Sequence, residues 1–183
     1  MDGRTIATIG ASVFVAFAGF VAAYLNNLRL ARRKDRLDRV SRQLSEFYGP
    51  LLSLVSTGTS TWTLFRKTYR PGGSFWGRPP EPTEDEAATW RLWMSEVFMP
   101  LNRRIAEVIH SKADLLEERE MPQCLLDVCA HVASYEPVLE RWAAGDFSEH
   151  TALSLFPQEE LQAYASRSFH SLKARQSLLL AEK

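Results

Sequence analysis

The chain has few of the residues, and none of the motifs, around which common catalytic sites are built. Its 183 residues include only two cysteines and four histidines. It contains no GxxxxGK(S/T) phosphate loop, GxSxG elbow, GxGxxG loop or HExxH pair. Because the candidate nucleophiles have no recognisable base, an enzyme is the least supported class of function, and no catalytic residue or cofactor is assigned.

The cysteines and histidines also lack metal-binding spacing. Cys124 and Cys129 are five residues apart, so on a helix their side chains point about 140° apart and do not readily share a metal with His131. Asp127 and His131 are expected to meet as a surface pair. The segment 146–150 has carboxylates beside a histidine but is more typical of helix caps. We expect reduced, buried thiols and no metal site.

Strand signals are nearly absent, and long stretches with helical spacing are separated by proline and glycine. The pattern predicts an all-α fold with an antiparallel, proline-kinked bundle of about four helices. Their connections are expected at 70–82, 114–120 and 146–156. Thr83 and Glu86 form a capping-box pattern, and Pro122 and Pro157 are each expected at the first position of a helix.

The most prominent feature that is present is an uncharged, mostly apolar run from Thr5 to Leu25. As a helix it would be roughly 30 Å long, the thickness of the hydrocarbon core of a bilayer. The alternative is a cleaved signal peptide, whose positive charge would precede a shorter apolar run. We expect an uncleaved transmembrane helix.

A basic cluster directly follows the apolar run. Residues 26–43 carry seven basic and two acidic side chains, whereas residues 81–160 carry six basic and seventeen acidic ones. Basic residues next to a span stay on the cytoplasmic side, which predicts an external amino terminus at the inner (cell) membrane of a bacterium. The side chains expected at the anionic lipid surface are Arg29, Arg32, Arg33, Lys34, Arg36 and Arg39. No nucleic-acid partner is expected.

The predicted transmembrane helix and the basic cluster divide the chain into three parts. They are a transmembrane anchor (1–25), a basic juxtamembrane helical stem (26–45) and a cytoplasmic helical bundle (46–183). The acidic turn 114–120 is expected near the stem arginines, where Asp114, Glu117, Glu118 and Glu120 would compete with anionic lipid for Arg29, Arg32, Arg33 and Arg36.

One helical seam connects the anchor and the stem. Leucine recurs every seven residues at 30, 37, 44 and 51, and Val40, Phe47 and Leu54 fill the alternate seam position. Continued backwards, the two positions reach four small residues in the anchor, Ser12, Ala16, Gly19 and Ala23. Small residues let transmembrane helices approach closely, so this stripe is a candidate self-association surface of a homo-oligomer. The alternative is that each half is an ordinary amphipathic or Ala-rich helix.

A short motif recurs as SEFYGPL (45–51) and SEVFMPL (95–101), with four identities. A third proline, Pro137, lies in a similar helical context. Folding the predicted helices as hairpins places Pro50, Pro100 and Pro137 near one level of the bundle, where neighbouring helices that bend together stay packed. The repeat thus has a structural reason that needs no ligand. The alternative is that exposed carbonyls at the kinks bind a ligand.

The connection after residue 68 combines aromatic and basic residues, which is typical of partner-binding surfaces. Its candidate contacts are Tyr69, Arg70, Phe75, Trp76 and Arg78. The alternative is that Phe75 and Trp76 fold back over the open end of the bundle.

The segments SEFYGPL, WRLWMSEVFMPLN (90–102) and GDFSEH (145–150) resemble a group of small bacterial membrane proteins with one amino-terminal span and a helical cytoplasmic part. The resemblance implies this architecture but no activity and no site residues. We therefore expect a membrane-tethered interaction or scaffold protein that holds a protein partner or a second copy of itself. The alternative is a sensor or regulatory subunit that responds to anionic lipid.

Overall fold

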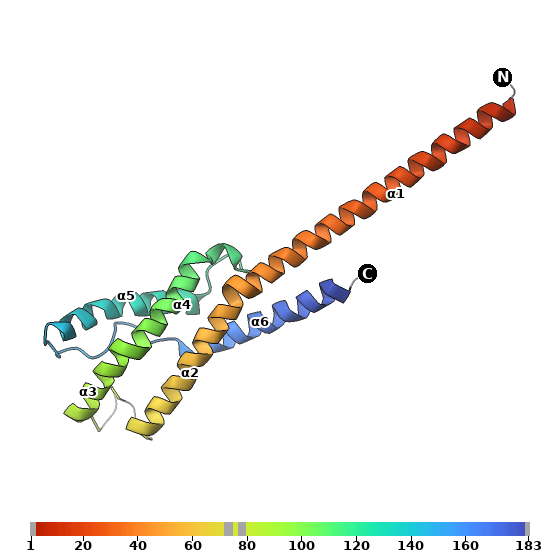
Figure 1. Ribbon diagram of the computed structural model, residues 1–183. Coiled ribbons are helices and arrows are strands. Elements are labelled where there is room, and N and C mark those ends of the chain that lie inside the picture. The colour runs from red at the N-terminus through yellow and green to blue at the C-terminus, as the bar shows by residue number, and fades with distance from the viewer. Residues whose placement is uncertain (1–2, 72–74, 77–79, 182–183) are drawn as a thin grey trace. The chain divides into compact units, whose positions relative to one another are not determined.

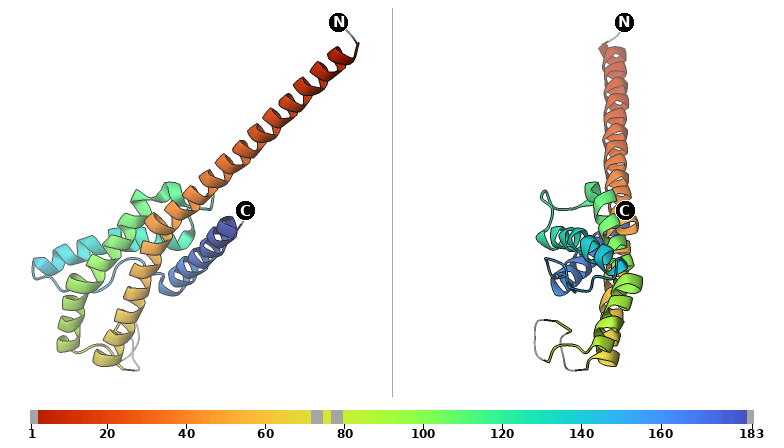
Figure 2. Two further views of the ribbon diagram at one scale, coloured as in Figure 1. Left: turned by 45° about the vertical axis from the view of Figure 1, so that its right-hand side comes forward. Right: turned by 90° about the vertical axis from the view of Figure 1, so that its left-hand side faces the viewer.

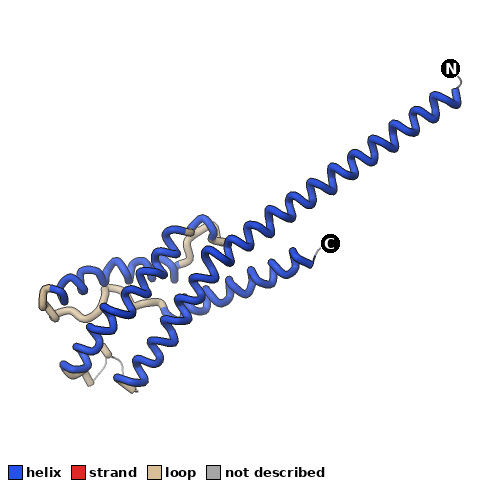
Figure 3. Tube along the Cα trace, viewed as in Figure 1, coloured by secondary structure: helices blue, strands red, loops and turns tan. Residues whose placement is uncertain are grey.

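The computed structural model describes residues 3–71, 75, 76 and 80–181, without the side chains of residues 3–13, 15 and 16. In these residues every regular element is helical, as predicted (Figures 1 and 3). The elements are α1 (Gly3–Arg42), η1 (Gln43–Tyr48), α2 (Gly49–Tyr69), α3 (Glu84–Trp93), η2 (Met94–Phe98), α4 (Met99–Ser111), η3 (Ala113–Leu115), α5 (Gln123–Ala143) and α6 (Gln158–Ala181).

The chain divides into two compact units. The terminal unit is Met1–Ser41 with Arg175–Lys183, and the core unit is Arg42–Ala174. These units are defined by internal contacts, whereas the predicted anchor, stem and bundle are defined by their location relative to a membrane. The predicted division therefore stays a prediction. Within the described part of the chain, no helix combines the length and the apolarity that crossing a bilayer requires.

In the terminal unit, the end of α6 is attached to α1. The Arg33 guanidinium donates to the Leu179 carbonyl oxygen from Nε at 2.9 Å and from Nη2 at 2.7 Å. The Gln176 amide donates to Ser41 Oγ at 3.1 Å. Because the carbonyl end of a helix carries partial negative charge, a guanidinium stabilises it there.

The core unit is built on a helical hairpin. The segment α3–η2–α4 runs antiparallel to α2, and α4 also packs on α5 (Figure 2). The second segment begins at the predicted capping box, in which Thr83 N–H donates to Glu86 Oε2 at 2.8 Å and Glu86 N–H donates to Thr83 Oγ1 at 3.3 Å. Pro122, expected at the first helical position, is instead the residue that caps α5. Pro157 likewise precedes α6, which begins at Gln158.

The repeated motif builds the same local structure twice. Each copy overlaps a π-helical turn, η1 or η2, which ends immediately before the residue–proline pair that opens α2 or α4. Gly49 N–H donates to the Leu44 carbonyl, and Met99 N–H donates to the Met94 carbonyl, each five residues back. A proline ring crowds the carbonyl four residues before it, and the wider turn relieves that crowding. Neither π turn was predicted from the amino-acid sequence.

The prolines do not all lie at one level, which corrects the prediction for Pro50. A Cβ at Gly58 of α2 would lie 3.2 Å from Leu101 Cδ2 of α4. In an antiparallel hairpin, the pairing of residues 58 and 101 places Pro100 level with residue 59, so Pro50 is offset from Pro100 by about nine residues, roughly 14 Å. The midpoint between residues 58 and 101 lies at about residue 80, beyond the middle of the predicted connection at 70–82. Pro137 does lie near Pro100, because Arg103 Nη2 pairs with Glu136 Oε2 at 2.7 Å.

The core is strongly aromatic. One cluster of buried side chains joins α2, α3, η2, α4 and α5 with Phe75 of the connection after α2. We call it the aromatic cluster: Phe65, Phe75, Trp90, Met94, Phe98, Met99, Tyr135, Val138 and Trp142. The leucine seam is buried at Leu44 and Leu51, whereas Leu30 is 52% exposed. Within the core unit the seam is therefore a core face at Leu44 and Leu51.

Candidate functional site

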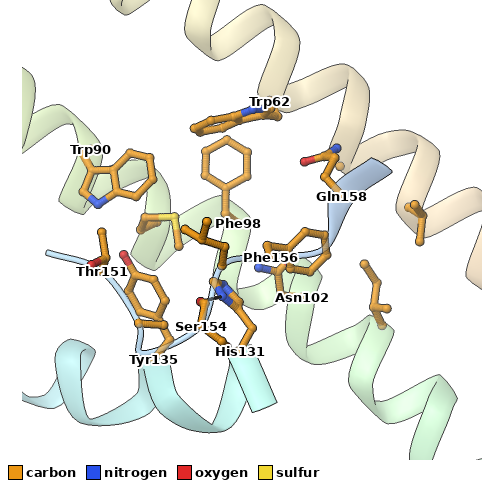
Figure 4. Close-up of a pocket in the computed structure, with 16 residues that line it drawn as sticks. Trp62, Trp90, Phe98, Asn102, His131, Tyr135, Thr151, Ser154, Phe156 and Gln158 are labelled. Atoms are coloured by element: carbon orange, nitrogen blue, oxygen red, sulfur yellow. Dashed lines mark hydrogen bonds between the residues drawn. The ribbon is translucent and has the colours of Figure 1, made fainter. Parts of the chain in front are cut away.

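A pocket of about 290 Å³ opens among α2, α3, η2, α4 and α5 of the core unit (Figure 4). Its walls are the side chains or backbone of Val55, Gly58, Trp62, Trp90, Met94, Phe98, Asn102, Ile105, His131, Tyr135, Thr151, Ala152, Ser154, Leu155, Phe156 and Gln158. No Asp, Glu, Lys or Arg is among these lining residues. The pocket is near the lower end of the size range of small-molecule sites.

The connection between α5 and α6 closes one side of the pocket, and we call residues 146–156 the strap. Three aromatic side chains hold its backbone carbonyls. Tyr135 Oη donates to the His150 carbonyl at 2.8 Å, and Trp90 Nε1 donates to the same oxygen at 3.1 Å. Trp142 Nε1 donates to the Glu149 carbonyl at 2.7 Å. The strap is thus fastened to both α3 and α5.

His131 is the most distinctive polar group of the pocket. It lies on α5, is 6% exposed, and its Nδ1 is 2.8 Å from the Ser154 carbonyl oxygen. Burial lowers the pKa of His131, more than the bond to Ser154 raises it, so the ring is neutral near pH 7. Since a carbonyl only accepts, Nδ1 carries the proton and Nε2 is left as an acceptor. Within the described residues, Nε2 has no hydrogen-bond partner.

Ser154 adds a second polar atom. Its Oγ is also buried without a partner among the described residues, so no hydrogen bond joins it to His131. A serine nucleophile needs its base within hydrogen-bond reach. The arrangement supplies binding groups in an apolar pocket rather than an assembled nucleophile and base.

The neutral, buried His131 should make folding depend on pH. The unfolded chain takes up a proton near pH 6.5, whereas the folded chain resists it until lower pH. Stability is therefore complete above pH 6.5 and should fall as the pH drops below it, by at most about 1.4 kcal/mol per pH unit. Urea unfolding of the wild type and of His131→Leu at several values between pH 5 and 7 measures the difference.

The matched control is His110→Leu, which removes an exposed histidine outside the pocket. His150 also has a pKa lowered by burial and contributes in the same direction, so His131→Leu should flatten the slope without abolishing it. If the free energy of unfolding fell equally with pH in the wild type and in His131→Leu, the assignment of His131 as a buried, neutral ring would be contradicted.

Comparisons with known proteins identified no relative of this chain. No family model, characterised protein or solved structure matches the chain. Its function is therefore argued from its own residues.

Two described residues of the predicted partner-binding connection, Phe75 and Trp76, pack on the helices. Phe75 is 3% exposed and belongs to the aromatic cluster, and Trp76 packs against that cluster and stacks on His150 at 4.0 Å between ring centroids. Arg70 is 7% exposed and donates to Glu86 Oε2 at 2.9 Å and to the Pro80 carbonyl. Tyr69 is 40% exposed, and Arg78 lies outside the described residues. Phe75 and Trp76 thus cover the helices, as in the second alternative, and partner binding at this connection stays a prediction.

The other predicted surfaces lie mainly on α1. The basic side chains Arg29, Arg32, Lys34, Arg36 and Arg39 are exposed, whereas Arg33 is partly buried on α6. Gly19 and Ala23 of the small-residue stripe are exposed, and the side chains of Ser12 and Ala16 lie outside the described set.

The acidic turn has partners of its own. Glu118 Oε2 accepts from Tyr164 Oη at 3.1 Å, and Glu117 N–H donates to Tyr48 Oη at 3.1 Å. The competition between this turn and lipid for the stem arginines stays a prediction.

Sequence reasoning missed the pocket and misplaced His131. The predicted surface pair with Asp127 is wrong, because Asp127 Oδ1 accepts from Gln123 at 2.8 Å while His131 is buried. One signal was present: residues 128, 131, 135, 138 and 142 follow the spacing of the buried face of α5. Cys124 and Cys129 are half-buried, free thiols whose pKa burial raises.

Proposed function

We propose that this chain is a membrane-anchored helical interaction protein with its core unit in the bacterial cytoplasm. The observation that carries the proposal is a group of large, exposed apolar side chains on α1. They are Phe14, Phe17, Phe20, Tyr24 and Leu25, with exposures of 71%, 65%, 69%, 58% and 47%. An apolar surface of this kind is typical of a segment that lipid or another protein covers. The uncharged run from Thr5 to Leu25 favours lipid.

The charges that follow the run support the orientation. Five exposed basic side chains between residues 29 and 39 adjoin it, which favours an external amino terminus and a cytoplasmic core unit. Each would gain about 1 kcal/mol next to anionic headgroups. This observation also favours the second candidate function, a sensor or regulatory subunit that responds to anionic lipid.

Self-association through the anchor is part of the proposal. A Cβ placed at Gly19 would meet nothing within 4 Å, so this point of the helix is open to a close neighbour. A second copy that uses the stripe Ser12, Ala16, Gly19 and Ala23 would form the homo-oligomer. The function is then to hold the core unit, and a protein partner bound to it, at the inner face of the membrane.

Two lysines in the apolar run should abolish anchoring. A lysine at the centre of a membrane helix costs roughly 3 kcal/mol, so Phe17→Lys with Phe20→Lys should move the protein from the membrane pellet to the soluble fraction after an alkaline wash. The control is Leu30→Lys, which charges another exposed apolar position of α1 outside the run and should remain in the pellet.

A wild-type chain that alkaline washing releases would contradict the proposal. The released double variant also separates the two candidate functions. Salt-sensitive binding of this variant to phosphatidylglycerol vesicles, but not to phosphatidylcholine vesicles, would support the sensor.

A further inference from the structure

The pocket of the core unit has an uncharged, largely aromatic lining. Aromatic rings line it from several elements: Trp62 lies across the pocket from His131, with Trp90 and Phe98 beside it (Figure 4). An ionised ligand buried there would find no lining side chain of opposite charge. The walls therefore suit a flat, uncharged and largely apolar molecule.

One buried acceptor atom of the pocket, Nε2 of His131, requires a hydrogen-bond donor on that molecule. Nε2 of His131 is a buried acceptor without a partner among the described residues, on a side chain that is only 6% exposed. The bond from Nδ1 to the Ser154 carbonyl fixes both the ring orientation and the tautomer. Leaving a buried acceptor unpaired costs free energy, and none of the described lining residues donates a hydrogen bond to Nε2.

We propose that the core unit binds a small, uncharged aromatic molecule whose hydroxyl or N–H group donates a hydrogen bond to Nε2 of His131. The size fits one or two rings, since about 290 Å³ is roughly twice the volume of an apolar cavity that admits benzene. Ser154 Oγ is a second buried polar atom of the lining without a partner among the described residues. The proposal goes beyond the interaction function and does not depend on membrane attachment.

Phenol, anisole and benzoate test the proposal on the full chain by titration calorimetry at pH 7.5. Phenol has the ring and the donor, anisole has the ring without the donor, and benzoate carries a charge. Phenol should bind, anisole should bind about tenfold more weakly because Nε2 stays unpaired, and benzoate should not bind measurably. Equal affinity for phenol and anisole, or preference for benzoate, would overturn the proposal.

His131→Leu removes the acceptor and keeps an apolar wall. In this variant the preference for phenol over anisole should fall to about one. His110→Leu, which changes an exposed histidine outside the pocket, should keep the tenfold preference. A tenfold preference that survives in a folded His131→Leu variant would refute the role of Nε2.

A measurement on the wild type covers the case in which His131→Leu does not fold. With ¹⁵N-labelled histidine, phenol should shift the Nε2 resonance of His131 toward that of a hydrogen-bonded nitrogen, and anisole should not. Tetramethylammonium is included because aromatic walls also attract cations. Tighter binding of tetramethylammonium than of phenol, or a phenol complex with an unchanged Nε2 resonance, would overturn the proposal.

Discussion

Replacing Phe65 by alanine should lower the free energy of unfolding of the core unit by about 4 kcal/mol. Phe65 is 1% exposed and lies at the centre of the aromatic cluster. Its ring stacks on Phe75 at 5.0 Å between centroids and meets Phe98 edge-on at 5.5 Å. Alanine would remove the transfer free energy of the ring and leave a cavity among rigid aromatic groups that cannot collapse into it.

Chemical unfolding followed by tryptophan fluorescence measures this loss. The matched control is the preceding residue, Leu64, which is 64% exposed, so Leu64→Ala should change stability by less than about 0.5 kcal/mol. Equal effects of the two substitutions would show that the aromatic cluster is not the main source of stability.

The same substitution links stability to the candidate site. Trp90 and Phe98 contact Phe65 on one side and line the pocket on the other. A cavity at residue 65 should therefore loosen the wall opposite His131. The folded unit and the pocket share one set of side chains, so ligand binding should stabilise the core unit against denaturant.

The sequence was sufficient for the features that local chemistry controls. The capping pair Thr83 and Glu86 begins the second helical segment as predicted, because its two hydrogen bonds lie within four consecutive residues. Gly145 ends α5 with φ +81°, its N–H donates to the Trp142 carbonyl at 3.0 Å, and Asp146 N–H donates to the Arg141 carbonyl at 2.9 Å. Such signals depend on neighbours in the chain and not on the rest of the fold.

The relative positions of Pro50 and Pro100 along the hairpin could not be predicted from such local signals. It depends on how far α2 slides along α4, and that offset is decided by the contact of Gly58 with Leu101 and by where the connection ends. Two helices can slide by a turn without changing the spacing pattern of either one. The repeat was visible, but the π turns that it builds were not.

The pocket was hidden for another reason. The strap is held through the backbone carbonyls of Glu149, His150 and Ser154. Every residue has a carbonyl, so the identities of the strap residues carry no record of these bonds. What the sequence does carry is the donors, Trp90, His131, Tyr135 and Trp142, and three of these look like ordinary core residues.

Gly49→Val should lower the free energy of unfolding by about 3 kcal/mol, although valine favours helix more than glycine does. Gly49 has ordinary helical angles, φ −67° and ψ −56°, so the need for glycine there is not conformational. It comes from the close approach of one backbone atom: a Cβ at residue 49 would lie 2.5 Å from the Leu44 carbonyl oxygen. That neighbour is backbone and moves only if the turn unwinds, which would rotate α2 by about 100° and turn Leu51 away from the core.

Gly19→Val is the matched control, because the same side chain enters a helix where nothing lies within 4 Å. Fluorescence-monitored unfolding of the core unit should show no loss for this variant. A loss below about 1 kcal/mol for Gly49→Val would mean that the turn yields easily. The second copy of the motif has Met99 at the equivalent place and makes the same five-residue bond to the Met94 carbonyl. A π turn therefore accepts a side chain in that setting, so the demand for glycine belongs to the close approach of Leu44 and not to π turns in general.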